Sequence, residues 1–384
     1  MASLYVHIPF CERKCIYCDF YSIESRTMTG EFLHALLKEI ELSSGHAKNE
    51  AIETLFFGGG TPSLLEPVAV ETILGALRSS FHFGPHPEIT LEANPGTVDE
   101  RKLEGYLKAG INRISFGVQS FFDDELSFLG RIHSSAQASS SIALAQRAGF
   151  DNINLDMIYA LPNQTFERWQ ENLRRAVAVG THHISAYSLI IEDKTPLARM
   201  VRSKQVSPLP TEAEAEMYDW TMRFLGGEGF DHYEVSNYAR PGRKSAHNCN
   251  YWNHSNYLGF GPSAHSFWGN GSSGHRRWWN VANVSSYVEK LARAELPVAG
   301  EERLDATQLF EEAVMLGLRN GLIDLKEIER CHGVDLLQAG RVVIEEAVAV
   351  GLAKLRGAQM SLTEKGFLVC DEITRTLVSL PKSA

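Results

Sequence analysis

The sequence has no long hydrophobic run, no excess of positive charge and few cysteines. No stretch of its 384 residues approaches the ~18 uncharged apolar residues of a membrane-spanning helix, and Met1 leads into a strand-like segment without a basic leader. We therefore expect a cytoplasmic protein. Lys and Arg number 37 against 47 Asp and Glu, a formal net charge of -10. This balance argues against a surface shaped as a whole for nucleic acid or anionic lipid.

The six cysteines are distributed unevenly. Three of them lie within eight residues, whereas Cys249, Cys331 and Cys370 are scattered through the rest of the chain. An odd-membered cluster in a large chain without a leader favours metal or redox chemistry over a disulfide framework. With 44% hydrophobic and 22% charged residues, the remaining composition is that of a globular protein, and at ~150 residues per domain the length indicates two or three domains.

Short apolar runs alternate with amphipathic segments over the first half of the chain. Several of these runs are continuously apolar, which is typical of strands buried on both faces. Thr97 and Glu100 form a capping box that predicts the start of the third helix, and Gly110 predicts its end. We expect strands at residues 3–9, 53–58, 88–93, 111–117, 152–158 and 183–190, and helices near 29–43, 66–80, 98–109, 122–148 with a break at Gly130, and 166–179.

Six strand-helix units predict an α/β fold with a parallel sheet curled into an incomplete (β/α)6 barrel, because a closed eight-unit barrel needs roughly 250 residues. Its active site is expected at the carboxyl ends of the strands. Residues 193–210 read as a connection, followed by a helix near 212–225 and a strand-like segment at 230–238. From Glu301 onward the pattern is mainly helical, with a hairpin near 355–362. We predict three domains, at 1–210, 211–300 and 301–384, the last resembling a winged helix.

The strongest chemical signal is the CxxxCxxC loop after the first strand. Three thiolates from Cys11, Cys15 and Cys18 can each hold one iron of a 4Fe-4S cubane, which leaves the fourth iron open to a substrate or cofactor. The alternative is a structural zinc site completed by His7. Such sites usually use two well-separated ligand pairs, and the sequence has no second pair.

This loop, with aromatic Tyr17 before its last cysteine, resembles the radical S-adenosylmethionine (SAM) superfamily. The resemblance implies that SAM chelates the open iron and that an electron from the cluster splits its sulfonium to give a 5′-deoxyadenosyl radical. Residues after the following strands offer SAM contacts. Gly58–Pro62 provides backbone that a ligand can approach closely, Arg131 can meet a carboxylate with two hydrogen bonds, and Asp156 in an apolar strand needs donors such as a ribose diol.

Taken together, the motifs resemble the oxygen-independent coproporphyrinogen III oxidase branch of that superfamily over almost the whole chain. The sequence departs from the oxidase pattern in two places. Phe20 stands where the oxidase has a fourth cysteine, and only ten residues precede Cys11. Both departures resemble the HemW-type heme chaperones. Matched position by position, the SAM contacts implied by the resemblance are Tyr5, Tyr17, Gly59, Gly60, Thr61, Glu92, Gln119, Arg131 and Asp156.

A third motif, HNxxYW at residues 247–252, resembles the heme-associated motif of those chaperones. Imidazole can coordinate heme iron while aromatic rings cover the macrocycle, so the resemblance makes His247 the expected axial ligand. Two alternatives stay open from the residues alone. His247 and Asn248 can instead tie down an irregular loop through hydrogen bonds, and the Cys249 thiolate can ligate iron as well.

The resemblance therefore implies a heme chaperone with a 4Fe-4S cluster, SAM and heme as bound groups. Its expected partners are heme-accepting proteins, among them respiratory enzymes, and an electron donor. The alternative function is a radical SAM enzyme that decarboxylates a porphyrinogen in the manner of coproporphyrinogen III oxidase. Whether the chain cleaves SAM is left open by the sequence.

Overall fold

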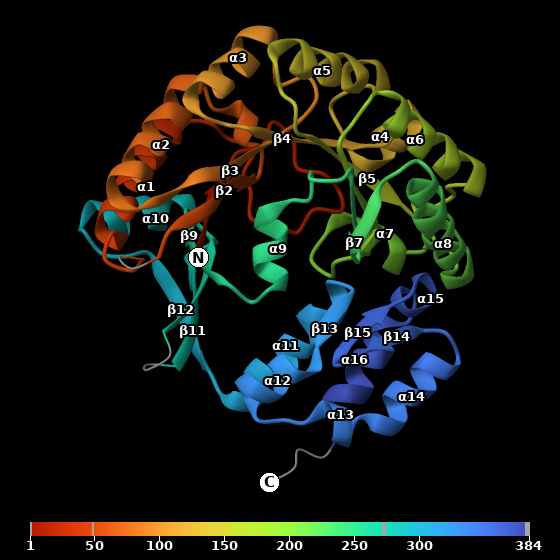
Figure 1. Cartoon of the computed structure of the whole chain (residues 1–384). Coiled ribbons are helices and arrows are strands. Elements are labelled where there is room, and N and C mark those ends of the chain that lie inside the picture. The colour runs from red at the N-terminus through yellow and green to blue at the C-terminus, as the bar shows by residue number, and fades with distance from the viewer. Residues whose placement is uncertain (1, 48–49, 271–273, 381–384) are drawn as a thin grey trace.

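Six parallel strands at the centre of the sheet follow one another in chain order (Figure 1). The computed structural model describes residues 2–47, 50–270 and 274–380. The central strands are β1 (Ala2–Ile8), β2 (Ile52–Gly59), β3 (Phe83–Ala93), β4 (Arg113–Gln119), β5 (Ile153–Tyr159) and β6 (His183–Ser188). All six predicted strands are present, and β3 begins earlier than predicted.

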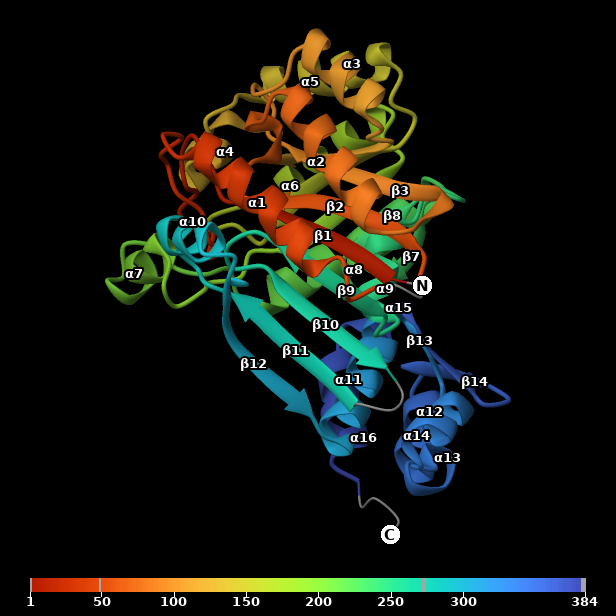
Figure 2. The ribbon, with the colours of Figure 1, turned by 90° about the vertical axis from the view of Figure 1, so that its left-hand side faces the viewer.

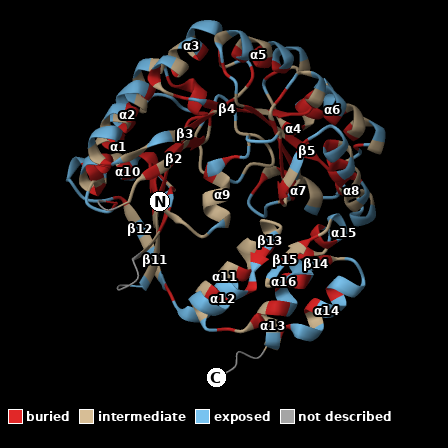
Figure 3. Ribbon diagram, in the orientation of Figure 1, coloured by how far each residue is buried: buried red, intermediate tan, exposed pale blue. Residues whose placement is uncertain are grey.

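Helices cover the outer side of these strands in an arc, with their apolar faces inward and their outer faces exposed (Figures 1 and 3). The partial barrel predicted from the sequence is thereby confirmed. Its helices are α1 (Thr29–Ser43), the 3-10 helix η1 (Pro62–Leu64), α2 (Pro67–Ser80), α3 (Glu100–Ala109), α4 (Asp123–Leu129), α5 (Ser135–Ala148) and α6 (Phe166–Ala178).

The start of α3 differs from the sequence prediction. Asp99 is the N-cap, and its side chain accepts a hydrogen bond from the backbone N–H of Lys102, whereas Thr97 donates its hydroxyl to the Asn94 carbonyl 2.7 Å away. The capping box between Thr97 and Glu100 is therefore wrong, because Asp is as good an N-cap as Thr and stands directly before the helix. Gly110 does end α3, in the left-handed conformation at φ 110°.

The two faces of the central strands differ in chemistry. Along β1, Leu4 and Val6 are fully buried in the core shared with the helices, while the alternate residues Ser3, Tyr5 and His7 face the barrel interior. The strands are buried on both faces, as predicted, but the interior face carries polar as well as apolar side chains. The inner faces keep polar side chains because they surround the site described below.

The middle of the chain extends the sheet at both edges and leaves the barrel open. The strand order is β12-β11-β10-β9-β1-β2-β3-β4-β5-β6-β8-β7, with β9 parallel to β1 and β8 antiparallel to β6. A helix, α7, forms within the predicted connection. The elements are α7 (Pro196–Arg202), α8 (Thr211–Gly227), β7 (Asp231–Glu234), β8 (Asn237–Ala239), α9 (Ala246–Trp252), β9 (Asn256–Phe260), β10 (His265–Asn270), β11 (Gly274–Asn280), α10 (Val284–Ala292) and β12 (Val298–Leu304).

The C-terminal segment forms a helical unit beside β10, β11 and β12 (Figure 2). Helix does not begin at Glu301 as predicted, since β12 continues to Leu304. The predicted hairpin is β14 and β15, which join β13 in a three-stranded antiparallel sheet. The elements are α11 (Ala306–Arg319), β13 (Leu322–Asp324), α12 (Leu325–His332), α13 (Leu336–Ala339), α14 (Arg341–Ala349), β14 (Ala353–Arg356), β15 (Gln359–Leu362), α15 (Glu364–Phe367) and α16 (Cys370–Val378).

The three predicted domains remain a prediction, because strands from residues 211–300 belong to the same sheet as the barrel. None of the helices in the described part of the chain is long and apolar enough to cross a membrane.

Candidate functional site

A cavity of about 480 Å³ lies at the carboxyl ends of the parallel strands, where the sequence predicted the site. Its lining combines the cysteine loop with the ends of β2 to β6. The three predicted cluster ligands, Cys11, Cys15 and Cys18, all contribute to it. Of the predicted SAM contacts, those that line the cavity are Tyr17, Gly59, Gly60, Thr61, Glu92, Gln119, Arg131 and Asp156.

The cysteine loop is held to the barrel by backbone hydrogen bonds. The N–H of Cys11 donates to the Ile23 carbonyl at 3.0 Å, and the N–H of Ile16 donates to Leu129 at the end of α4. Cys11 is buried, whereas Cys15 and Cys18 are partly exposed to the cavity. Burial raises the pKa of the Cys18 thiol to about 11 and also raises that of Cys11. Without metal, these two thiols therefore hold their protons at neutral pH.

Two polar groups of the cavity wall already contact the thiols. The Thr61 hydroxyl donates to Cys11 Sγ at 3.6 Å, and the Arg131 guanidinium donates to Cys15 Sγ at 3.4 Å. Donors to sulfur stabilise thiolate ligands and tune a cluster's reduction potential.

The donor set fits a cluster better than a single ion. Among the described residues, no three His, Cys, Asp or Glu side chains are arranged around one metal position. A cubane needs no such convergence, since each thiolate binds a different iron. The zinc alternative also loses its fourth ligand, because His7 contacts the Tyr5 hydroxyl with one ring nitrogen and the Tyr21 carbonyl with the other, at 3.1 and 2.8 Å.

The glycines after β2 are required by the chain itself. Gly59 has φ 107°, and a Cβ there would lie 2.5 Å from the His7 ring. A Cβ on Gly60 would lie 2.6 Å from the Phe10 carbonyl oxygen, directly before Cys11. Both glycines therefore let β2 approach β1 and the start of the cysteine loop, and they leave bare backbone facing the cavity.

Two carboxyl groups, on β3 and β5 with β4 between them, give the cavity an acidic floor. Burial and, to a lesser degree, the nearby carboxyl of Asp156 raise the pKa of Glu92 to about 8, while the hydrogen bond from the Gly59 amide opposes the shift. Burial also raises the pKa of Asp156, although Asn154 and Ser115 donate to it at 2.8 and 3.0 Å. Such groups are best stabilised by a ligand that brings an ammonium group and hydroxyl donors, which SAM has.

Arg131 joins three parts of the cavity wall. Besides Cys15, its guanidinium donates to the Asn94 side-chain oxygen at 2.5 Å and to the Gly117 carbonyl at 2.6 Å, and its buried Nε has no partner in the described structure. Asn94, which also donates to Thr61 at 3.1 Å, was not predicted as a site residue. The only sequence signal for it is its position just after β3.

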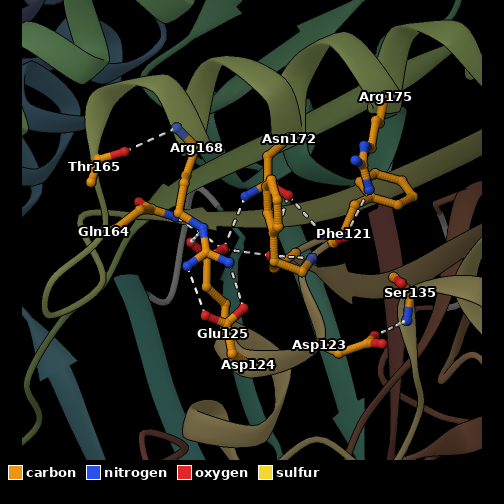
Figure 4. Close-up of polar contacts among 12 residues, drawn as sticks. Phe121, Asp123, Asp124, Glu125, Ser135, Gln164, Thr165, Arg168, Asn172 and Arg175 are labelled. Atoms are coloured by element: carbon orange, nitrogen blue, oxygen red, sulfur yellow. Dashed lines mark hydrogen bonds and ion pairs between the residues drawn. The ribbon is translucent and has the colours of Figure 1, made fainter.

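Gln119 enters the cavity from a backbone conformation that side chains seldom adopt. Its φ is 68°, so surrounding contacts must hold it there. Phe121, two residues further along the chain, belongs to the buried network in Figure 4. Glu125 accepts from the Ser120 hydroxyl at 2.5 Å and from the Asn172 amide at 3.0 Å, and the oxygen of that amide accepts from the Phe121 N–H at 2.6 Å.

Tyr5 and His247 do not line the cavity as the structure describes it. Helix α9 lies inside the arc of the barrel and contacts the amino ends of the strands, opposite the cavity (Figure 1). His247 is buried there, with Nδ1 2.8 Å from the Thr54 hydroxyl and Nε2 3.0 Å from the Tyr251 hydroxyl. Its ring also stacks on Phe56, which in turn stacks on Tyr5.

This environment favours the structural alternative for His247. Burial lowers its pKa to about 3, and an axial heme bond would require one ring nitrogen to lose its hydroxyl partner. Cys249 is only partly buried, and burial raises the pKa of its thiol. Heme ligation by either residue stays a prediction.

Comparison with known proteins agrees with the site. Residues 5–176 match the Radical SAM superfamily, and residues 304–369 match the HemN C-terminal domain. Coproporphyrinogen III oxidase from Escherichia coli, described as a radical SAM enzyme, has the same fold, with a TM-score of 0.84 over 98% of this chain and 90% of that one, at 22% identity.

Proteins named heme chaperone HemW are more similar in sequence. The one from Mycobacterium tuberculosis H37Rv is 36% identical over 98% of this chain and 94% of its own length, and the one from Bacillus subtilis is 33% identical over 97% and 98%. At this identity and coverage, the chain belongs to the family of the HemW heme chaperones, within the radical SAM superfamily.

Proposed function

We propose that the chain is a heme chaperone that binds heme, carries a 4Fe-4S cluster with SAM, and passes heme to acceptor proteins. Near full-length similarity to the HemW heme chaperones is the observation that carries the proposal. The cavity supports the part that concerns the cluster, because the CxxxCxxC loop and the strand-end polar groups meet in one place.

We assign the cluster to Cys11, Cys15 and Cys18. When bound, the cluster and SAM supply one-electron reductive chemistry at a sulfonium. The protein's residues hold these groups in place. Thr61 and Arg131 donate to the thiolates, and the Gly59–Gly60 backbone leaves room beside the cysteine loop.

The remaining polar groups are assigned to SAM. Glu92 accepts from the N–H groups of the SAM amino group, Asp156 accepts from ribose hydroxyls, and Arg131 attracts the carboxylate. Gln119 adds an amide, and the next two residues, Ser120 and Phe121, bond to the Glu125 network. These roles are consistent with the raised pKa values of the two acids, since each lacks an ion-pair partner among the described residues.

We further propose that the protein works in the cytoplasm with heme-accepting proteins, respiratory enzymes among them, and a separate electron donor. All six cysteines are free thiols, as a reducing compartment would keep them.

An anaerobic assay with reconstituted protein tests the proposal against the enzymatic alternative. We expect stoichiometric binding of hemin, transfer of that heme to an acceptor apoprotein, and no turnover of coproporphyrinogen III. Conversion to protoporphyrinogen with release of 5′-deoxyadenosine would instead establish the decarboxylase. A protein without cluster, such as Cys15→Ala, is the control for SAM-dependent steps.

A further inference from the structure

The cavity has two walls of different chemistry. The side chains assigned to the cluster and SAM come from the cysteines and from the ends of β2 to β5. The opposite side, from the end of β6 and the last part of the cysteine loop, has no role in that assignment. Besides polar residues such as Ser188 and Glu192, this side and Ile158 of β5 place five large apolar or aromatic side chains in the lining. We call these the apolar wall: Phe20, Ile158, Tyr187, Leu189 and Ile190.

Part of the apolar wall is backed by a small core of its own. Leu189 and Tyr17 pack against buried Leu129, Ile158 and Leu161, a cluster separate from the main core. The wall is therefore a built surface and not a loose loop end.

Its outer residues are unusually exposed for their type. Phe20 is 66% exposed, Ile190 67% and Tyr187 40%, and all three lie at the same cavity. Exposed large apolar side chains gathered at one concave site indicate a ligand surface. Phe20 is also the residue that replaces the fourth cysteine of the oxidase pattern, so this difference lies on the wall.

The charges at the rim suit an apolar ligand with carboxylates. Arg13 and Lys14 line the cavity together with Asp19 and Glu192. Arg13 forms no ion pair in the described part of the chain. The Lys14 ammonium donates to the Phe20 carbonyl at 2.8 Å, which holds its charge beside the wall. Two cations beside exposed apolar residues can receive the two propionates of a tetrapyrrole whose face rests on the wall.

We propose that the apolar wall is the heme-docking surface, with the macrocycle against Phe20 and Ile190 and its propionates at Arg13 and Lys14. The inference rests on the proposed heme chaperone function and gives that function its location. It places heme at the mouth of the SAM cavity and away from α9, where His247 has both ring nitrogens engaged.

Hemin titration of the cluster-loaded protein tests the location. The double variant Phe20→Ala/Ile190→Ala removes the two most exposed side chains of the wall. We expect its hemin affinity to fall at least tenfold, with the 4Fe-4S absorption and the SAM affinity unchanged. The matched control is Val68→Ala/Val342→Ala, which truncates two residues of equal exposure on α2 and α14 and should bind hemin as the native protein does.

Metal-free protoporphyrin IX supplies a second readout that does not depend on iron ligation. A surface that recognises the macrocycle binds it with an affinity close to that of hemin and loses it in the double variant. Unchanged affinities of the double variant for both porphyrins would overturn the inference. Absence of hemin binding to the native protein would overturn the proposed function itself, so the two failures are distinguishable.

Discussion

At the scale of single residues, we expect the ionisation of Glu92 to depend on whether SAM is bound. Because burial raises its pKa to about 8, Glu92 is mostly protonated in the ligand-free cavity below that pH, and Asp156 beside it opposes ionisation. A cationic ligand favours the ionised form. SAM binding near neutral pH should therefore release the proton that Glu92 carries in the ligand-free cavity.

We expect the SAM affinity of the cluster-loaded protein to rise as the pH increases from 6.5 to 8.5. Glu92→Gln should bind SAM more weakly and lose most of this pH dependence, because its amide cannot ionise. Isothermal titration calorimetry in buffers of different ionisation enthalpy measures both quantities. A pH dependence that is identical in the variant would assign it to another group.

His247 illustrates a residue whose expected role and observed surroundings differ. We predict that His247→Ala lowers the free energy of unfolding by about 2 kcal/mol, because Thr54 and Tyr251 each lose a buried hydrogen-bond partner. His34→Ala, at an exposed position of α1, is the control. Urea denaturation measures the difference, and a variant as stable as the control would contradict the structural role.

The sign of its pH dependence follows from the lowered pKa. The folded protein keeps His247 neutral down to about pH 3, while the unfolded chain takes up a proton near pH 6.5. The contribution of neutral His247 to the free energy of unfolding is therefore fully present above about pH 6.5, and it is lost as the pH falls from there toward about 3. His247→Ala lacks this contribution, so its free energy of unfolding should fall less steeply with decreasing pH than that of the native protein.

At the scale of elements, the Glu125 network joins α4 and α6 to Phe121, in the segment that follows β4 (Figure 4). Asn172→Ala removes the amide that bonds both Glu125 and the Phe121 backbone. We expect the variant to fold with its cluster intact and to bind SAM about fivefold more weakly, because the Gln119 backbone relaxes from its left-handed conformation.

The control for this change is Glu167→Gln, at an exposed position of the same helix. The EPR spectrum of the reduced cluster separates a positioning role from a general loss of stability. With Asn172→Ala, the spectral change on adding SAM should require more SAM to saturate, while the spectrum without SAM stays the same. A shift in the SAM-free spectrum would instead indicate damage to the cysteine loop.

The elements themselves follow well from local sequence. Apolar runs give β1 to β6, and Gly110 ends α3 because a residue in the left-handed conformation suits glycine. The N-cap of α3 was misassigned because Thr97 and Asp99 are both good caps, and only the three-dimensional contacts choose between them. The polar inner faces are not evident from the composition of whole strands. Polar and apolar residues alternate along a strand such as β1, and only the curvature of the barrel turns the polar ones toward a shared interior.

The candidate site divides in the same way. The cysteine loop and the strand-end residues were predicted from motifs, whereas Asn94 and the apolar wall were not. Residues such as Ile190 carry no motif, and their role appears only when the end of β6 folds beside the cysteine loop. The motif singles out His247 in the sequence, but it does not show which side chains His247 contacts, since its partner Thr54 is nearly two hundred residues away in the chain.

At the scale of the whole molecule, the C-terminal unit is joined to the barrel by polar contacts as well as by apolar packing, such as that of Phe367 on α15 against His232 on β7. Arg277 on β11 donates to Glu312 on α11 at 2.6 Å and to Glu302 on β12 at 2.9 Å, and these side chains are partly buried. The unit also receives a backbone bond from Val235 to the Arg319 carbonyl.

We predict that Glu312→Gln weakens this docking by about 1 kcal/mol, a value limited by partial solvent screening of the ion pair. Hydrogen exchange in α11 should accelerate about fivefold, while exchange in β1 to β5 stays as in the native protein. Glu329→Gln on α12, which is exposed, serves as the control. Equal acceleration in the barrel strands would mean that the two parts unfold as one unit.

The position of α9 has a further consequence for traffic through the protein. Helix α9 occupies the barrel interior at the amino ends of the strands, so ligands reach the cavity from the carboxyl ends. In the arrangement proposed above, SAM lies deeper in the cavity than heme, so SAM is loaded first and is exchanged only after heme has left. In that arrangement, heme binds last and leaves first.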